Sequence, residues 1–348
     1  MTKYLLYPFT VIYYYLSELN RILTKPKKLD KPVISIGNIT WGGSGKTPMT
    51  IEVAKYILSL GKTPVILSRG YARNNKQLKN VIVRDKEKIL ADIEVSGDEP
   101  YMMAKLVNCP IIIGADRFES ANLAKQFNPD IFILDDGFQH WKLQRDLDIV
   151  CINALNPFGN GMTIPSGILR EKKSALKRAK IVAITNCNLA NKDKTYNLRQ
   201  EIFKLTDEIP IEVSCKNYEI INMYNNSKIE NIDLFRRDNS FVVMSAIGSP
   251  DNFVNTVINL GLKIKEEIIF SDHHKYKEKD IASIVNSLSY NEKIITTAKD
   301  AVKITDITDT KMQKKIYILN VSISFNNGRE VFEKQINSLL GINNDKQK

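Results

Sequence analysis

Cysteine is rare in this sequence, and its four copies are far apart. Cys109, Cys151, Cys187 and Cys215 form no C-x-x-C pair, so neither a zinc knuckle nor a dithiol redox centre is indicated. Such a sequence favours a reducing compartment. Glycine and proline are scarce too, at 16 and 12 of 348 residues, while 43% of the residues are hydrophobic. This balance excludes a fibrous, collagen-like or largely disordered chain, and the length predicts about two domains.

Acidic residues are outnumbered by basic ones. The 50 Lys and Arg exceed the 39 Asp and Glu, which gives a formal charge of +11 and a pI near 9.2. A surface with this excess attracts anions. Nucleic acid, phosphorylated metabolites and an anionic membrane face are the partner classes that fit.

No run of eighteen apolar residues is present, which excludes a membrane-spanning helix. Residues 4–17 carry no charge, but they are too few to span a bilayer, and no signal peptide is expected. Apolar residues recur there at the spacing of one helical face, namely Leu5, Phe9, Ile12, Leu16, Leu19 and Leu23, and are followed by Lys25, Lys27, Lys28 and Lys31. Two hypotheses stay open: a helix lying in an anionic membrane surface, and a helix packed on its own domain.

Short β-branched runs alternate with helical segments from Pro32 onward, which predicts parallel sheets covered by helices. The predicted strands are 33–37, 65–68, 111–114, 131–135, 149–153 and 181–185, then 241–246, 267–270, 293–297 and 316–320. The predicted helices are 47–60, 100–107, 117–127, 251–260 and 279–288. The polar, Asn-rich stretch 216–239 separates the two sets. We therefore expect an α/β core domain over residues 1–215 and a smaller α/β domain over 216–348 that includes the C-terminal helix.

A glycine-rich turn follows the first predicted strand, in the stretch VISIGNITWGGSGKTP of residues 33–48. This order suits a phosphate-binding loop, in which backbone N–H groups surround phosphate oxygens, a lysine reaches the β and γ phosphates and a threonine holds Mg²⁺. The candidate residues are Gly42, Gly43, Ser44, Gly45, Lys46 and Thr47. Thr40 stands where the usual pattern has its first glycine, and a glycine-rich turn without a ligand is the alternative.

Paired aspartates end the predicted strand 131–135. A phosphate loop needs a second carboxylate for its metal, normally at the end of a neighbouring strand. Adjacent carboxylates repel each other unless a cation lies between them, so Asp135 and Asp136 are candidate Mg²⁺ ligands. The alternative is a pair of surface-turn aspartates.

Other polar groups gather at predicted turns. Arg69, Arg73 and Arg170 are placed to neutralise phosphoryl charge. Asp98 opens a predicted helix, where an acid is more often a cap than a catalyst. His273 and His274 are adjacent and point in different directions, so we expect a general base or its partner there and no shared metal. The roles of Lys299 and Asp300 stay open.

The motifs of this chain, taken together, resemble those of one family. They are residues 37–40, 42–48, 68–71, 97–100, 135–140, 168–171, 272–273 and 299–303. In this order, over nearly the whole chain, they are similar to the tetraacyldisaccharide 4'-kinases of lipid A assembly. Thr40 is normal for that family.

The resemblance implies an ATP-dependent kinase that phosphorylates the 4'-hydroxyl of a tetraacyldisaccharide 1-phosphate at the cytoplasmic face of the bacterial inner membrane. It also implies a P-loop NTPase-type parallel-sheet core domain, joined by two linker strands to a second, smaller α/β domain. The family's N-terminal helix associates with the membrane, which favours that hypothesis for residues 4–23.

The resemblance further implies residue roles. The family's catalytic aspartate and its histidine partner fall on Asp98 and His273, which lie in different predicted domains. The remaining roles are transition-state stabilisation by Lys46 and Arg170, Mg²⁺ binding by Thr47, Asp135, Asp136 and Glu171, phosphate binding by Arg69, Arg117 and Arg170, and a sugar contact by Asn38.

Two rival functions fit parts of the sequence. The charge and the phosphate loop suit a nucleoside triphosphatase acting on nucleic acid or protein, but no run of base-stacking aromatics and no known RNA or DNA motif is present. No nucleic-acid partner is therefore expected. A peripheral membrane protein that binds nucleotide without catalysis is the second rival, and the paired aspartates argue against it.

Overall fold

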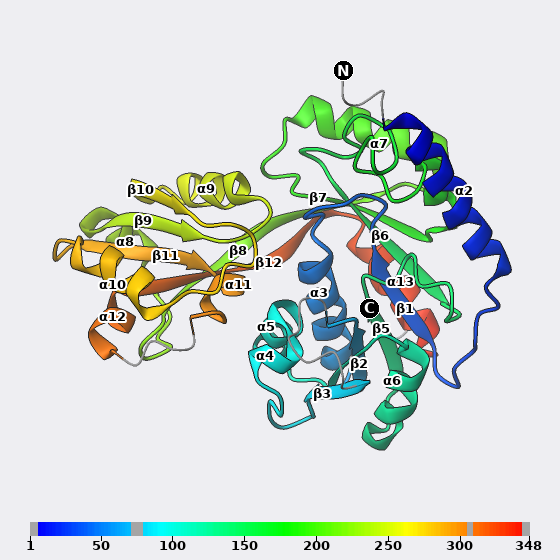
Figure 1. Cartoon of the computed structure of the whole chain (residues 1–348), viewed down its shortest axis with the longest axis horizontal. Helices are drawn as coiled ribbons and strands as arrows, with labels where there is room; N and C mark the ends of the chain where they lie inside the picture. The colour runs from blue at the N-terminus through cyan, green and yellow to red at the C-terminus, as the bar shows by residue number, and fades with distance from the viewer. Residues whose placement is uncertain (1–5, 71–78, 305–308, 343–348) are drawn as a thin grey trace. The chain divides into compact units, whose positions relative to one another are not determined.

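The computed structural model describes residues 6–70, 79–304 and 309–342 (Figure 1). Leu5 and Arg73 lie outside the described residues. The chain forms two compact units: Met1–Cys215 together with Ile323–Lys348, and Lys216–Ser322. It crosses the boundary between the units twice, within the long strands β8 (Ile211–Asn222) and β12 (Ile316–Asn327).

The first unit is built on a mostly parallel sheet. Its strands are β1 (Val33–Gly37), β2 (Pro64–Ser68), β3 (Asn80–Arg84), β4 (Ile111–Gly114), β5 (Ile131–Asp135), β6 (Leu147–Asn153) and β7 (Ile181–Thr185). They lie in the order β7-β6-β1-β5-β2-β4-β3, and β3 alone of these runs antiparallel to its neighbour. The central strands are rich in Ile and Val because both of their faces are buried.

Helices cover both faces of this sheet. They are α2 (Tyr7–Leu23), α3 (Lys46–Ser59), α4 (Ile93–Ser96), α5 (Asp98–Leu106), α6 (Arg117–Ala124), α7 (Lys192–Thr206) and α13 (Arg329–Leu339), with short 3₁₀ helices at Lys125–Phe127 and Lys173–Arg178. Helices α3, α5 and α13 pack on one face, and α6, α7 and the second 3₁₀ helix pack on the other. The predicted α/β class with a parallel-sheet core is confirmed.

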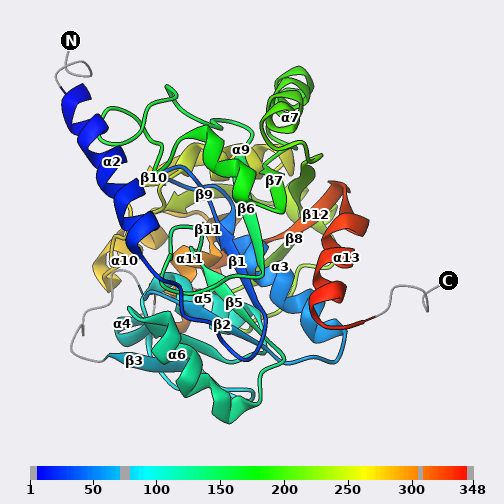
Figure 2. The same cartoon turned by 90° about the vertical axis from the view of Figure 1, so that its right-hand side faces the viewer.

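The C-terminal helix differs from the sequence-based expectation, which placed it in the smaller domain. Phe332 and Ile336 of α13 are buried in the same cluster as Ile57 of α3, and the Tyr56 hydroxyl donates a hydrogen bond of 2.9 Å to Asn337 Oδ1. Figure 2 shows α13 next to α3. The helix therefore belongs to the first unit, because β12 returns the chain there before α13 begins.

The second unit has a smaller parallel sheet. Its strands β9 (Ser240–Ser245), β10 (Lys263–Ile269) and β11 (Glu292–Thr297) lie with β12 in the order β10-β9-β11-β12. Its helices are α8 (Ile232–Asp238), α9 (Pro250–Asn259), α10 (Glu278–Asn286), α11 (Ala298–Ala301) and α12 (Thr310–Lys315). Part of β8 and all of α8 occupy the polar stretch 216–239, where the sequence predicted only a boundary.

Helix α2 presents its apolar face outward. Phe9, Ile12, Leu16, Leu19 and Leu23 are each between 51% and 70% exposed. The helix packs on its own domain through the side that carries the buried Thr10, and it leaves this apolar face largely exposed. None of the described helices is both long enough and apolar enough to cross a membrane.

Candidate active site

The glycine-rich turn of residues 38–45 joins the end of β1 to the start of the 14-residue helix α3. Gly45 precedes the helix with a φ of +80°, and Gly42 has a φ of +110°. Glycine adopts these left-handed conformations without the strain that a side chain would cause. The turn thus presents backbone amides at a helix N-terminus, which is the local structure that binds phosphate.

Asn38 supports this turn from inside. It is fully buried, and its Nδ2 donates a hydrogen bond of 2.8 Å to Ser44 Oγ. The side chain therefore holds the turn, which differs from the sugar contact that the family resemblance implied for Asn38. The amide of Gln139 donates to the Asn38 carbonyl at 2.9 Å.

The motif at residues 168–171 lies directly against the phosphate loop. The N–H of Trp41 donates to the Ile168 carbonyl at 2.6 Å, and the N–H of Arg170 donates to the Ile39 carbonyl at 2.7 Å. These backbone hydrogen bonds place Arg170 beside the acidic pair at the end of β5. Its Nη1 donates to Asp136 Oδ1 and Oδ2 at 2.9 and 3.0 Å.

The two aspartates have different surroundings. Asp135 is buried and accepts hydrogen bonds from Ser68 Oγ at 3.0 Å and from Thr50 Oγ1 at 3.4 Å. Burial, with the nearby charges of Glu99 and Asp136, raises the pKa of Asp135 to about 6.

The side chain of Asp136 points in a different direction from that of Asp135, because the backbone of Asp136 has a φ of +50°. Its Oδ1 lies 3.6 Å from Lys46 Nζ. Partial burial by itself raises the pKa of Asp136, but the charges of Lys46 and Arg170 outweigh that effect and hold the pKa below its ordinary value. Asp136 therefore stays ionised over the pH range in which Asp135 takes up its proton.

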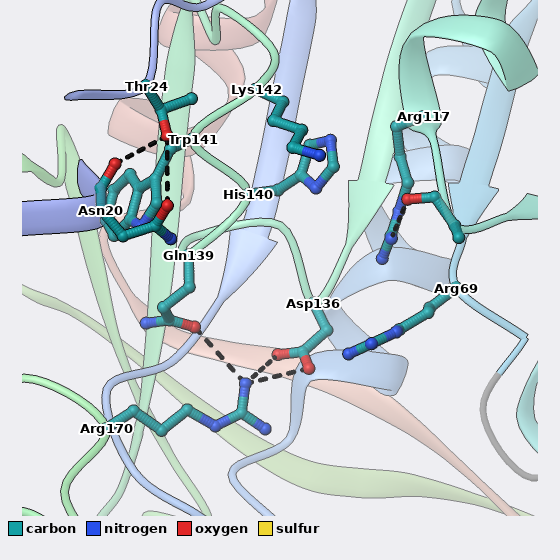
Figure 3. Close-up of a pocket in the computed structure, with 11 residues that line it drawn as sticks. Asn20, Thr24, Arg69, Arg117, Asp136, Gln139, His140, Trp141, Lys142 and Arg170 are labelled. Carbon is teal, nitrogen blue, oxygen red and sulfur yellow. Dashed lines mark hydrogen bonds and ion pairs between the residues drawn. The ribbon is translucent and has the colours of Figure 1, made fainter. Parts of the chain in front are cut away.

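A pocket of about 300 Å³ opens beside Asp136 (Figure 3). Its lining residues are Asn20, Thr24, Arg69, Ala115, Arg117, Asp136, Gln139, His140, Trp141, Lys142 and Arg170. Arg69 and Arg170 point toward Asp136 from opposite sides in Figure 3. Four of the lining residues are Arg or Lys and one is an acid, so the pocket suits an anionic group.

Buried polar atoms of the pocket also lack partners within the described residues. They include Nε of Arg117 and Nε2 of His140. Burial, with the charges of Arg117 and Arg145, lowers the pKa of His140 to about 4, so its ring is neutral at pH 7. Buried groups of this kind are normally hydrogen-bonded, and a polar ligand in the pocket would supply the missing partners.

Glu171, which the family resemblance implied as a Mg²⁺ ligand, already makes two hydrogen bonds within the protein. Its Oε1 accepts a hydrogen bond of 2.8 Å from Gln139 Nε2, and its Oε2 accepts one of 2.7 Å from Arg178 Nη2. Both oxygens of this buried side chain thus already have protein partners. The described residues contain no group of three or more His, Cys, Asp or Glu side chains placed to hold a metal.

Asp98 is the first residue of α5, and Gly97, with a φ of +83°, occupies the N-cap position without a side-chain cap hydrogen bond. Asp98 thus lies in the first turn of the helix, where a carboxylate is favoured by the helix dipole. Glu99 beside it acts on the pKa of Asp135, which places this helix start near the acidic pair. Asp98 belongs to the first unit and His273 to the second.

The two adjacent histidines of the second unit have different environments. His273 has a φ of +62°, and its N–H donates to Asp272 Oδ1 at 3.0 Å. The ring of His274 stacks on Phe270 with centroids 4.5 Å apart, and its Nε2 lies 3.2 Å from Asp280 Oδ2. His274 is thus fixed by packing, which leaves His273 as the candidate for chemistry.

The open question about Asp300 is answered by its burial. Asp300 is fully buried and pairs with Lys303 at 2.7 Å. It also accepts a hydrogen bond of 3.1 Å from the N–H of Ala246. This pair joins helix α11 and the residues after it to Ala246, the residue after β9, and its role is structural.

Comparison with known proteins gives the family. The family model LpxK, tetraacyldisaccharide-1-P 4'-kinase, matches residues 2–341. The chain belongs to that family. A relative named tetraacyldisaccharide 4'-kinase from Halothermothrix orenii is 34% identical over 320 residues, which is 88% of this chain and 83% of that one. One of the same name from Elusimicrobium minutum is 36% identical over 311 residues, 88% of this chain and 82% of that one.

A solved structure of the 4'-kinase family has the same fold. It is the "apo" form of LpxK from Aquifex aeolicus in complex with ATP, with a TM-score of 0.77 at 28% sequence identity. The match covers 98% of this chain and 100% of that one. The family resemblance drawn from the sequence motifs is confirmed.

In this member of the 4'-kinase family, most of the predicted site residues of the first unit lie close together. Lys46, Asp136, Arg69, Arg117 and Arg170 surround or line one region. The sequence did not identify the side chains that support them. Ser68, Thr50, Gln139 and Arg178 are such residues. Ser68 and Gln139 lie within the motifs of the sequence, but a single sequence does not show which side chain each of the four contacts.

We expect Asp135→Asn to remove a pH-dependent loss of stability. The raised pKa means that the folded protein binds this proton more tightly than the unfolded chain, so stability falls as pH rises from about 4 to about 6. Urea unfolding across that range measures the effect, and an unchanged pH dependence in the variant would contradict it. Asp136→Asn is the matched control, and it should instead lower stability at neutral pH by removing the ion pairs with Lys46 and Arg170.

Proposed function

We propose that this chain transfers the γ-phosphoryl group of ATP to the 4'-hydroxyl of a tetraacyldisaccharide 1-phosphate in lipid A biosynthesis. One observation carries the proposal: Asp136 lies 3.6 Å from Lys46 of the phosphate loop and 2.9 Å from Arg170 of the cationic pocket. Asp136 thus contacts both the turn that suits a triphosphate and the pocket that suits an anionic acceptor. The names of the curated relatives and the ATP complex of the Aquifex aeolicus protein support the two substrates.

On the nucleotide side, the loop amides and Lys46 would bind the β and γ phosphates. Thr47, in the first turn of α3, and the Asp135/Asp136 pair have the hydroxyl and carboxylate oxygens that Mg²⁺ prefers. Mg²⁺ held there would neutralise charge on the triphosphate, and it binds through few protein side chains because it usually keeps several waters. Glu171 is left out of this set because both of its oxygens are already paired.

On the acceptor side, Arg69, Arg117 and Arg170 would bind the 1-phosphate or the phosphoryl group in transfer. Asp98, oriented by His273, would accept the proton of the 4'-hydroxyl. The freed oxygen bonds to the γ-phosphorus as the bond from that phosphorus to the ADP oxygen breaks. An assay with labelled ATP distinguishes this kinase from a nucleic-acid-dependent triphosphatase. The kinase transfers the label to the lipid, and the label does not appear in nucleic acid or as free phosphate alone.

Replacing Lys46 by Ala should lower kcat by a factor of about 100 or more with the fold intact, because a donor to developing phosphoryl charge is typically worth that much. Transfer of label from ATP to the lipid disaccharide phosphate measures it. Lys55→Ala is the matched control, since Lys55 is an exposed lysine on the same helix. Near-normal turnover of the Lys46 variant would contradict the phosphate-loop role.

Replacing His273 by Gln should lower kcat and change the dependence of kcat on pH, because the partner of the general base is lost. The adjacent change His274→Gln should lower stability through the lost Asp280 contact and leave the shape of the pH profile intact. The same profile in the wild type and the His273 variant would show that His273 has no part in proton transfer.

We further propose that α2 lies in the cytoplasmic face of the inner membrane. Residues 216–322 contain 15 Lys and Arg against 14 Asp and Glu, so nearly all of the excess of +11 belongs to the first unit, which carries α2. The opposite side of α2 is attached to the domain by Thr10, whose Oγ1 donates to Ser166 Oγ at 2.7 Å. Helix α2 turns its apolar face outward, and the domain that carries it has a net positive charge. Both features are expected of a protein that binds an anionic lipid surface.

The double change Leu16→Asp and Leu19→Asp should abolish sedimentation with vesicles that contain anionic phospholipid, because two charges would enter the headgroup boundary. Leu90→Asp, at a leucine that is 49% exposed and lies outside α2, is the control and should sediment as the wild type does. Sedimentation of the double variant at the wild-type level would exclude α2 as the membrane contact.

A further inference from the structure

Two carbonyl groups of the phosphate loop are held by side chains from neighbouring strand ends. Asn153 Nδ2 donates a hydrogen bond of 3.1 Å to the Gly43 carbonyl, and Thr185 Oγ1 donates one of 3.0 Å to the Ser44 carbonyl. Asn153 and Thr185 are the last residues of β6 and β7, and they are register partners. The loop that leaves β1 therefore reaches over the end of β6 to the end of β7 (Figure 1).

These contacts fix the direction of the next two amides. In a trans peptide group the carbonyl of one residue and the N–H of the following residue point in opposite directions. A Gly43 carbonyl held toward Asn153 turns the Ser44 N–H away from the strand ends. A Ser44 carbonyl held toward Thr185 does the same for the N–H of Gly45.

We propose that Asn153 and Thr185 are positioning residues that hold the N–H groups of Ser44 and Gly45 toward the bound triphosphate. This inference rests on the proposed function, since it assigns the supports of the same phosphate loop. Amides that already point at their ligand need no reorganisation when it binds, which is the advantage of a preorganised site.

The orientation of the Asn153 amide follows from its other contacts. Its Oδ1 accepts hydrogen bonds of 3.1 Å from the Leu155 N–H and from Asn186 Nδ2. Both of these partners are donors, so this atom must be the carbonyl oxygen and the opposite atom must be the NH₂ group. The group that faces the Gly43 carbonyl is therefore a donor.

Thr185 acts on the loop with both ends of its side chain. Its hydroxyl has one hydrogen and two carbonyls in reach, Ser44 at 3.0 Å and Ile152 at 3.3 Å, and the Ser44 contact is the shorter. A Cβ built on Gly45 would lie 3.1 Å from the Thr185 methyl carbon, where the φ of +80° already disfavours a side chain. Thr185 is 2% exposed, so its rotamer is fixed by packing.

The experiment compares ATP binding by full-length variants in the presence of Mg²⁺, measured by calorimetry. Thr185→Val keeps the shape of the side chain and removes its donor, and we expect it to raise the Kd for ATP by about tenfold, the upper range for one hydrogen bond. Asn153→Ala should raise it by about fivefold. In turnover assays both changes should raise the KM for ATP more than they lower kcat.

Two controls separate positioning from general destabilisation. Thr185→Ser keeps the hydroxyl and should retain the ATP affinity within about threefold. Thr296→Val is matched to Thr185→Val, because Thr296 is also a buried threonine near the end of a parallel strand and donates at 2.8 Å to the Met244 carbonyl. It should leave the Kd for ATP unchanged even where it lowers the thermal midpoint.

The outcomes distinguish this inference from the function on which it rests. A wild-type chain that binds no ATP would contradict the proposed function. ATP binding that Thr185→Val and Asn153→Ala leave within about twofold of the wild type would contradict only the positioning role. If Thr185→Ser and Thr296→Val lowered the ATP affinity equally, the stability of the protein and not the hydrogen bond to Ser44 would set that affinity. This result would also contradict the positioning role.

Discussion

The ion pairs of Asp136 with Lys46 and Arg170 are the contacts on which the site of the first unit depends. An acid placed between two cations compensates charges that would otherwise repel each other beside the phosphate loop. The left-handed backbone of Asp136 makes this arrangement possible, because it turns the second aspartate away from the buried Asp135. Two adjacent carboxylates thereby take different environments and different protonation behaviour.

The parallel sheet explains why these residues meet. Strands β7, β6, β1 and β5 end at the same edge, and each contributes a side chain or a loop there: Thr185, Asn153, residues 38–45 and Asp135. Ligands of open α/β sheets bind at the carboxyl ends of strands for this reason. The support of the phosphate loop by β6 and β7 is a consequence of strand order, since β6 lies directly beside β1.

The first unit combines this site with an apolar helix and most of the chain's positive charge. Asn20 of helix α2 and its C-cap residue Thr24 line the pocket beside Asp136, while the apolar face of α2 points outward. A headgroup in the pocket and acyl chains along the outer face of one helix would suit an amphiphilic acceptor. One side of α2 thus borders a polar pocket while another side is apolar and exposed.

The sequence by itself determined the α/β class and the family, and it located the glycine-rich turn and the paired aspartates. These features are local: alternating apolar runs encode strands and helices, and a glycine-rich turn encodes its own backbone conformation. Only the tertiary structure decided that α13 packs on the first unit, that Asn38 and Glu171 are engaged inside the protein, that His274 is packed, and that Asn153 and Thr185 hold the loop. The physical reason is that a hydrogen bond or an ion pair depends on how the folded backbone places two groups in space. A single sequence shows this neither for close neighbours such as Asn38 and Ser44 nor for Thr185 and the Ser44 carbonyl, which are 141 residues apart.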